Sequence, residues 1–232
     1  MILQRVAPSQ AAPFKRPREV IYPGSDGKPL AETDIHFTAI AALIALLRRH
    51  FENRPDVYVA GCNFIYYKEG DNKARFSPDV YVVFGVEKKA RRSYFLWKDH
   101  EAPSVVFKFT SKKTKKNDLT TKKDLCASLG VKEYFVCDPE SAYFKPALQG
   151  YCLQKGVYQP IKSSSDGKLP CRELSAMLRL ENLQLALYDE KTGERFMTDA
   201  DAARAEANRA NSAEAELNRL RAELDRIKNR PS

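Results

Sequence analysis

Hydrophobic residues recur along the first half of the chain with two different periods. Over residues 34–51 they return every three or four positions, which predicts an amphipathic helix. The apolar runs that follow are shorter and rich in β-branched and aromatic residues, which favours strands. These strands are expected at 56–60, 62–67, 80–84, 104–109 and 131–137, with a second helix at 117–129. The run at 80–84 is apolar throughout, as expected of a strand that is buried on both faces.

The pattern changes after about residue 143. Residues 150–161 predict a β-hairpin, and residues 183–188 predict a further strand. The segment 87–97 is strongly basic and is expected to be a loop. From residue 199 the chain is rich in Ala, Arg, Glu and Asn. Four apolar residues of this segment alternate spacings of three and four: Leu217, Leu220, Leu224 and Ile227.

The C-terminal pattern therefore predicts a long exposed helix with two possible roles. It could pair with a second copy as a short coiled coil, or it could pack on its own domain as an amphipathic terminal helix. The whole order of elements indicates an α/β (α+β) protein with a central mixed sheet flanked by helices, an added β-hairpin region and a long C-terminal helix. One domain is expected at residues 20–197, after a flexible basic arm at 1–19 and before the helical segment 198–232.

Composition narrows the range of partners and compartments. The formal net charge is +9, and such a basic excess favours polyanions, nucleic acid first. The five cysteines are odd in number and lack the short spacing of a zinc knuckle, so we expect reduced thiols in a reducing compartment. No apolar run is long enough to span a bilayer, and the N-terminus lacks the apolar stretch of a signal peptide. We therefore expect a cytoplasmic protein without a membrane partner.

Two features in the apolar middle of the chain could carry chemistry. Ser77-Pro78-Asp79 leads directly into the buried run 80–84, which places a carboxylate at the mouth of a strand; Pro-Asp is also a common turn-to-strand dipeptide. Lys108 interrupts the otherwise apolar strand at 104–109. A lysine in this position must reach solvent, meet a carboxylate or line a polar cavity, and an edge strand with one solvated face is the simplest alternative.

A third feature is a tract of lysines directly after this strand. Phosphate contacts from such a tract would depend on salt and not on sequence, whereas the ordinary interpretation is a solvated run of charge. The tract consists of Lys112, Lys113, Lys115 and Lys116, and Lys122 and Lys123 follow on the predicted second helix.

In this order, these features resemble the PD-(D/E)XK nuclease superfamily, and more closely the Uma-two group of restriction endonucleases. The resemblance covers residues 22–139 well and continues more loosely to about residue 196. The segments that carry it are 31–36 before the first helix, 77–80, 105–111, Asp118 with Lys122 and Lys123, and 129–139, which ends in Asp138-Pro139.

The resemblance implies a metal-dependent endodeoxyribonuclease that acts on DNA. A divalent cation, Mg²⁺ or Mn²⁺, would lie between acidic side chains, activate water and stabilise charge on the attacked phosphate. Asp79 would be a direct metal ligand, and Glu32 would be the acidic residue contributed before the first helix. Lys122 or Lys123 would supply the basic group, and we assign it to Lys123. His36 lies near Glu32 in the sequence and could approach the site or be an ordinary helix histidine.

The chain departs from the pattern of the family at one position. Members carry a glutamate where this strand has Lys108, so a carboxylate ligand is replaced by an ammonium group. The enzyme could be inactive, another carboxylate such as Glu101 or Asp118 could enter the site, or Lys108 could pair with Asp79 or Glu32 in place of the cation. We expect a Lys108–Asp79 pair and impaired or lost cleavage. Two other functions stay open: a non-catalytic nucleic-acid-binding module, and an assembly module that associates through the terminal helix.

Overall fold

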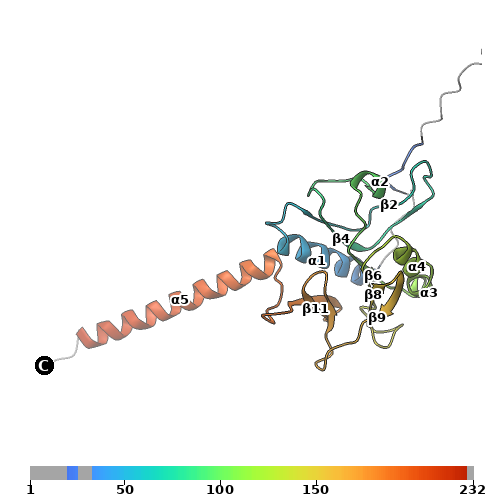
Figure 1. Ribbon diagram of the computed structural model, residues 1–232. Helices are drawn as coiled ribbons and strands as arrows, with labels where there is room; N and C mark the ends of the chain where they lie inside the picture. The colour runs from blue at the N-terminus through green and yellow to red at the C-terminus, as the bar shows by residue number, and fades with distance from the viewer. Residues whose placement is uncertain (1–19, 26–32, 229–232) are drawn as a thin grey trace, which may run out of the picture.

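A mixed sheet of six strands forms the centre of the molecule (Figure 1). The computed structural model describes residues 20–25 and 33–228, with side chains up to residue 224. The helices are α1 (Asp34–His50), α2 (Leu96–Asp99), α3 (Lys115–Leu119), α4 (Thr121–Ser128) and α5 (Asp199–Lys228). The strands are β1 (Val57–Ala60), β2 (Ile65–Tyr66), β3 (Arg75–Phe76), β4 (Val80–Phe84), β5 (Tyr94–Phe95), β6 (Val105–Phe109), β7 (Glu133–Cys137), β8 (Leu148–Gln154), β9 (Val157–Pro160), β10 (Leu169–Cys171), β11 (Ala176–Glu181) and β12 (Gln184–Asp189).

The strand order of the central sheet is β1-β4-β6-β7-β8-β9. Only β6 and β7 pair in parallel, and the helices α3 and α4 form the connection between them. The remaining neighbours are antiparallel. This arrangement confirms the predicted class, a mixed sheet flanked by helices, with a β8–β9 hairpin added at one edge.

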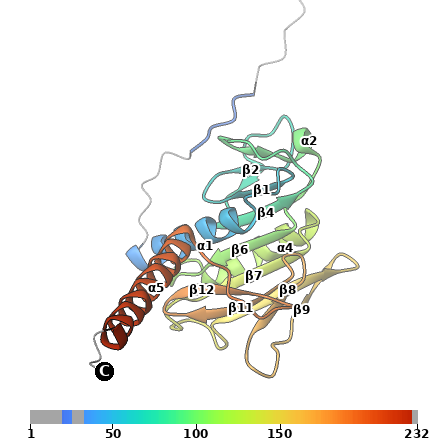
Figure 2. The same cartoon turned by 90° about the vertical axis from the view of Figure 1, so that its left-hand side faces the viewer.

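Each face of the central sheet covers its own hydrophobic core. The first core lies against α1 and the small sheet β10-β11-β12, and β6 contributes Val105, Phe107 and Phe109 to it (Figure 2). The second core contains residues of α4 and of the small sheet β3-β2-β5, and β6 contributes Val106. Because side chains alternate along a strand, Lys108 must also lie on this second face.

Helix α1 begins where the sequence predicted it. The Thr33 side chain accepts a hydrogen bond from the backbone N–H of His36, and Asp34 lies in the first turn, where a negative charge is favourable. The last turn carries Arg48 and Arg49, which suit the opposite end of the helix dipole. The apolar stripe of α1 packs into the first core.

Several predicted elements were wrong in detail. The helix expected at 117–129 is two helices, because Thr120 adopts a non-helical backbone with φ −123° and ψ −99° and so separates α3 from α4. The loop expected at 87–97 contains β5, which pairs with β2, and the start of α2. The strands β3, β10 and β11 were not predicted; β10 contains Pro170, which is atypical of a strand and tolerated here at the edge of its sheet.

Helix α5 leaves the domain and projects away from it (Figures 1 and 2). Its 30 residues correspond to a length of about 45 Å at 1.5 Å per residue. The first turn is fixed to the domain by an ion pair between Arg49 and Asp199. Thr198 caps the helix reciprocally with Asp201, since each side chain accepts from the backbone N–H of the other. No helix in the described parts of the chain is long and apolar enough to cross a membrane.

Candidate functional site: a buried lysine–aspartate pair

Asp79 and Lys108 meet because of the register between two central strands. Val80, the first residue of β4, lies opposite Phe107 of β6 in an antiparallel pair, so the next position on each strand brings Asp79 beside Lys108. Both side chains are buried, with 8% of Asp79 and 6% of Lys108 exposed. Strand β6 lies between β4 and β7, so the interpretation of Lys108 as part of an edge strand was wrong.

The contacts within this pair use both oxygens of the carboxylate. Lys108 Nζ forms an ion pair with Asp79 Oδ1 and also donates to the carbonyl oxygen of Ser77 at 3.3 Å. Asp79 Oδ2 accepts the backbone N–H of Phe109 at 2.6 Å. The expected Lys108–Asp79 pair is therefore present, with the ammonium group against the carboxylate.

Opposing effects act on the pKa of Lys108. Burial alone would lower it, because removal from water penalises the ammonium form. Charge attraction to Asp79 and the hydrogen bond that Lys108 donates to it act in the other direction, with a smaller contribution from the charge of Asp118. Their combined effect raises the pKa of Lys108 above its ordinary value, so the side chain stays a cation at neutral pH.

Asp118 is a second buried carboxylate beside this pair. It is completely buried in α3, and its charge is near enough to act on Lys108. Its Oδ1 accepts from Lys122 Nζ at 2.7 Å, and its Oδ2 accepts from the hydroxyl of Thr110 at 3.1 Å. Of the two alternative carboxylates considered from the sequence, Asp118 reaches the site. Glu101 precedes β6 at the other end of the strand, where its backbone carbonyl accepts from Tyr94 Oη.

The two helix lysines take different positions. Lys122 is directed to Asp118, four residues earlier on the adjoining helix. Lys123, to which we assigned the catalytic role, instead lies over the ring of Tyr151, with its Nζ 4.3 Å from the ring centroid. The structure thus brings Lys122 rather than Lys123 into the cluster. The i, i+4 spacing of Asp118 and Lys122 was the sequence signal for this contact.

The remaining predicted residues lie around this cluster or outside the described chain. The tract lysines Lys112, Lys113, Lys115 and Lys116 are all exposed, between β6 and the middle of α3. His36 is buried on the other face of the sheet, where its ring meets the edge of the Phe109 ring. Glu32 and the arm at 1–19 lie outside the described residues.

The described side chains do not fit a divalent cation at Asp79. Each oxygen of Asp79 and of Asp118 already accepts a hydrogen bond, and two lysine ammonium groups balance the two carboxylates. Within residues 20–25 and 33–228 no group of three His, Cys, Asp or Glu side chains is arranged to hold a metal ion. A metal ligand set at this point would need the ammonium group of Lys108 to leave.

Comparison with known proteins assigns the chain to a family. The model of the Uma2 family, described as "Putative restriction endonuclease", matches residues 10–187. The chain belongs to the Uma2 family. Among solved structures, the family member described here is similar to a crystal structure of a putative nuclease belonging to DUF820 from Anabaena variabilis, with 13% identity and a TM-score of 0.49 over 66% of this chain and 81% of that chain. No curated protein matches the sequence.

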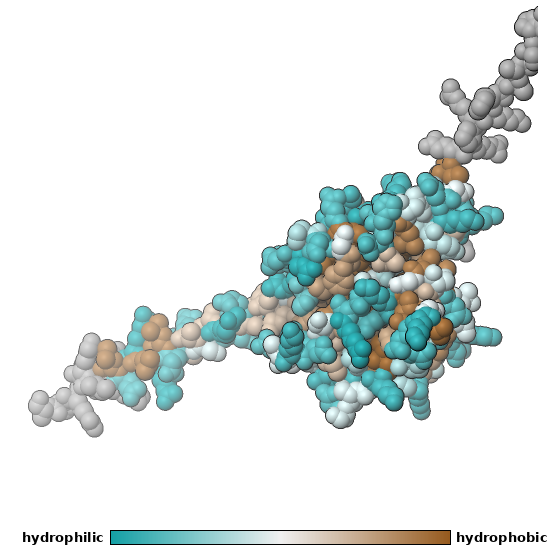
Figure 3. Space-filling view, viewed as in Figure 1, coloured by the Kyte–Doolittle hydropathy of each residue, from teal (hydrophilic) through white to brown (hydrophobic). Residues whose placement is uncertain are grey.

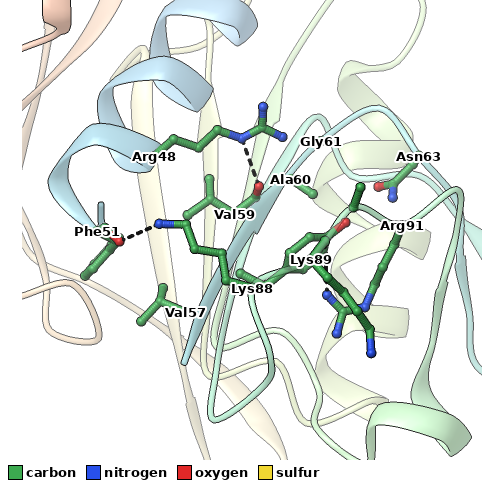
Figure 4. A pocket seen from close by; sticks show the side chains of 12 residues that line it. Arg48, Phe51, Val57, Val59, Ala60, Gly61, Asn63, Lys88, Lys89 and Arg91 are labelled. Atoms are coloured by element: carbon green, nitrogen blue, oxygen red, sulfur yellow. Dashed lines mark hydrogen bonds between the residues drawn. The ribbon is translucent and has the colours of Figure 1, made fainter. Parts of the chain in front are cut away.

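This Uma2 protein also has a pocket lined in part by basic residues, apart from the buried pair (Figure 4). The pocket measures about 470 Å³ and runs along β1, since the consecutive residues 57–61 all line it. Arg48, Lys88, Lys89 and Arg91 surround it, and no carboxylate is among its lining residues. Arg48 and Lys88 are held by backbone carbonyls, of Val59 and of Phe51 and Glu52. The side chains of the buried pair do not line this pocket.

Proposed function

We propose that this Uma2 protein binds DNA through the lysine-rich surface around α3 and α4, and that its metal-dependent cleavage of phosphodiester bonds is severely weakened. The observation that carries the proposal is the buried ion pair between Lys108 and Asp79. The family supports a nuclease-type ancestry for the fold, and the pair occupies the carboxylate that would be the principal metal ligand.

The physical argument rests on charge at close range. A divalent cation at Asp79 would approach an ammonium group in a site from which water is largely excluded, and like charges repel strongly there. Displacing Lys108 would leave its cation buried and unpaired, because β6 is enclosed between two strands. Metal binding therefore has to offset both costs, and we expect its affinity to be low.

The proposed DNA surface uses charges that the fold leaves exposed. Lys112, Lys113 and Lys116 point into solvent next to the site, and the chain as a whole carries a net charge of +9. Lysines of this kind neutralise phosphates and release counterions, which gives affinity that is independent of sequence and falls with salt. The partner would be duplex DNA in the cytoplasm, and the five cysteines, which form no disulfide in the described structure, suit that reducing compartment.

The first test compares plasmid cleavage by the unaltered protein and by Lys108→Glu, in Mg²⁺ and in Mn²⁺. Lys108→Glu supplies a carboxylate beside Asp79, so we expect nicking to rise about a hundredfold, the size typical of one group that stabilises transition-state charge. Lys108→Gln is the matched control, because it removes the ammonium group without adding a metal ligand. Metal-dependent thermal stabilisation of the Glu variant alone would show that the restored site is occupied.

Two results would contradict the proposal. If the unaltered protein nicks plasmid as fast as Lys108→Glu, and Asp79→Ala abolishes that nicking, the site is active with Lys108 present. If Lys108→Glu binds metal but leaves nicking at the level of Lys108→Gln, the substitution at this position is not what limits cleavage.

DNA binding is measured separately, by anisotropy of a labelled duplex in a chelator and over a series of salt concentrations. Lys113→Gln with Lys116→Gln should reduce the slope of log affinity against log salt by up to about two, one for each phosphate contact. Lys155→Gln with Lys191→Gln is the control, since both residues are exposed in turns outside α3 and α4. Equal effects of the two pairs would contradict a specific basic surface.

A further inference from the structure

The outer part of α5 has no partner within the described chain. Every residue from Glu206 to Leu224 is exposed, although the helix continues to Lys228. A free-standing helix in water gains little from its backbone hydrogen bonds alone, and most helical stability in proteins comes from packing of an apolar face. In a single copy of the chain, this part of α5 therefore lacks the packing partner that would stabilise it.

An apolar seam runs along that exposed part. Leu217, Leu220 and Leu224 alternate spacings of three and four, and 47%, 53% and 52% of these side chains are exposed. Figure 3 shows a hydrophobic area towards the far end of α5, the part of the helix that contains these leucines. Ala210 and Ala213 continue the same spacing towards the domain. Such spacing is that of positions a and d in a heptad repeat.

The charges that flank the seam are complementary between two copies. We place Leu217 and Leu224 at heptad position a and Leu220 at position d. The g positions are then occupied by Arg209 and Glu216. The e positions are occupied by Glu214 and Arg221. In a parallel coiled coil each g residue faces the e residue five positions later on the partner helix. The facing pairs are then Arg209 with Glu214 and Glu216 with Arg221, and both join opposite charges.

We propose that α5 pairs with α5 of a second copy of this chain, as a parallel two-stranded coiled coil in this register. The pairing places both folded domains at the same end of the coil. The dimer therefore carries two copies of the basic surface around α3 and α4. That these two surfaces act together on DNA rests on the proposed function. A bivalent particle gains avidity for a long duplex without any new contact.

The antiparallel arrangement is disfavoured by the same charges. An antiparallel pair brings g residues together and e residues together. When the three leucines of the two copies overlap, Glu216 lies near Glu223 of the other helix, and the two Arg221 side chains approach each other. The leucine seam is also short, so we expect an affinity in the micromolar range instead of a permanent dimer.

The first test measures the mass of the full-length chain by sedimentation equilibrium over a micromolar concentration series, without nucleic acid. We expect association towards twice the 26.3 kDa of the chain. Leu220→Lys should hold the mass at that of one chain, because it places a charge in the seam. Asn218→Lys adds the same charge to the same helix outside the seam and should associate as the unaltered chain does.

The second test concerns orientation and register. Glu216→Arg should weaken association about tenfold, since it faces Arg221 of the partner with a like charge. Adding Arg221→Glu restores opposite charges across a parallel pair and should return the dissociation constant to its starting value. Circular dichroism of each variant checks that the helix itself is retained.

Three outcomes would overturn the proposal: a single-chain mass at all concentrations, association that Leu220→Lys leaves unchanged, or failure of the double variant to recover. These measurements contain no DNA and no metal. Their failure is therefore distinguishable from failure of the proposed binding and cleavage properties, which are measured on nucleic acid.

Discussion

Lys108 is stable in the middle of the sheet because Asp79 lies beside it. A buried ammonium group without a partner would lose its hydration and gain no ion pair in return. The pKa of Lys108 would then fall instead of rising. Asp79 depends on Lys108 in the same way, with the backbone N–H of Phe109 as its other donor. The two residues should therefore tolerate joint replacement better than the loss of one.

We expect Lys108→Met to destabilise the protein by about 3–5 kcal/mol, because it leaves the Asp79 carboxylate buried without its cation. Adding Asp79→Asn should recover much of this loss, since the amide is neutral and its oxygen can still accept from Phe109. Urea denaturation of both variants, with Asp79→Asn alone completing the cycle, measures the coupling. A double variant no more stable than Lys108→Met would show that the pair is not the coupled unit described here.

The sequence predicted one of these contacts and not the others. The mid-strand lysine and the family resemblance predicted the Lys108–Asp79 pair, whereas the Lys122–Asp118 contact was not predicted although its i, i+4 spacing allows it. The hydroxyl of Thr110 on Asp118 and the carbonyl of Ser77 on Lys108 depend on how α3 and the β3–β4 connection pack against β6. That packing has no local signature in the sequence.

At the scale of elements, the C-terminal end of α1 packs against the segment that leads into α5. The His50 ring stacks on the Phe196 ring with centroids 3.8 Å apart and planes 8° apart. Partial burial of the ring lowers the pKa of His50 from its ordinary value, and the charge of Asp189 opposes this less strongly. The folded protein therefore takes up this proton less readily than the unfolded chain does.

The free energy of unfolding should depend on pH through the titration of His50. Below about pH 6.5 the unfolded chain binds the His50 proton first, so the free energy of unfolding should fall as the pH is lowered from 7.5 to 5. His50→Gln removes this titrating group, and its stability should fall less over the same range. Urea midpoints of the two proteins at each pH give the difference directly. Parallel profiles would contradict the assignment, because the other two histidines are the same in both.

At the scale of the whole molecule, the domain and the outer part of α5 should be energetically separate. Within the deleted segment 206–232, every residue whose side chain the structure describes is exposed, so we expect the stability of the domain to change by less than about 0.5 kcal/mol. Trp97 is the single tryptophan and lies in the domain, so its fluorescence reports domain unfolding alone.

A larger deletion from residue 198 is the comparison for this prediction. It also removes Asp199, the partner of Arg49, and should cost at most about 1 kcal/mol because that pair is exposed. A large loss with the shorter deletion would mean that α5 packs back on the domain, the alternative interpretation of its amphipathic pattern.

The sequence by itself determined the elements whose signal is periodic and local. The spacing of apolar residues located α1 and its first residue, the buried strands β4, β6 and β7, and α5. The order of these elements was enough for the mixed-sheet class, and the segments around Asp79 and 129–139 were enough for the family.

Only the tertiary structure decided which of these residues meet. The break at Thr120, the two-residue strands and the strand β10 with its proline are set by neighbouring elements, which override weak local propensity. The same holds for the site: Lys108 is central because β4 and β7 enclose β6, and Lys122 faces Asp118 while Lys123 faces Tyr151. Register and packing between segments distant in sequence fix such contacts, and no single segment contains that information.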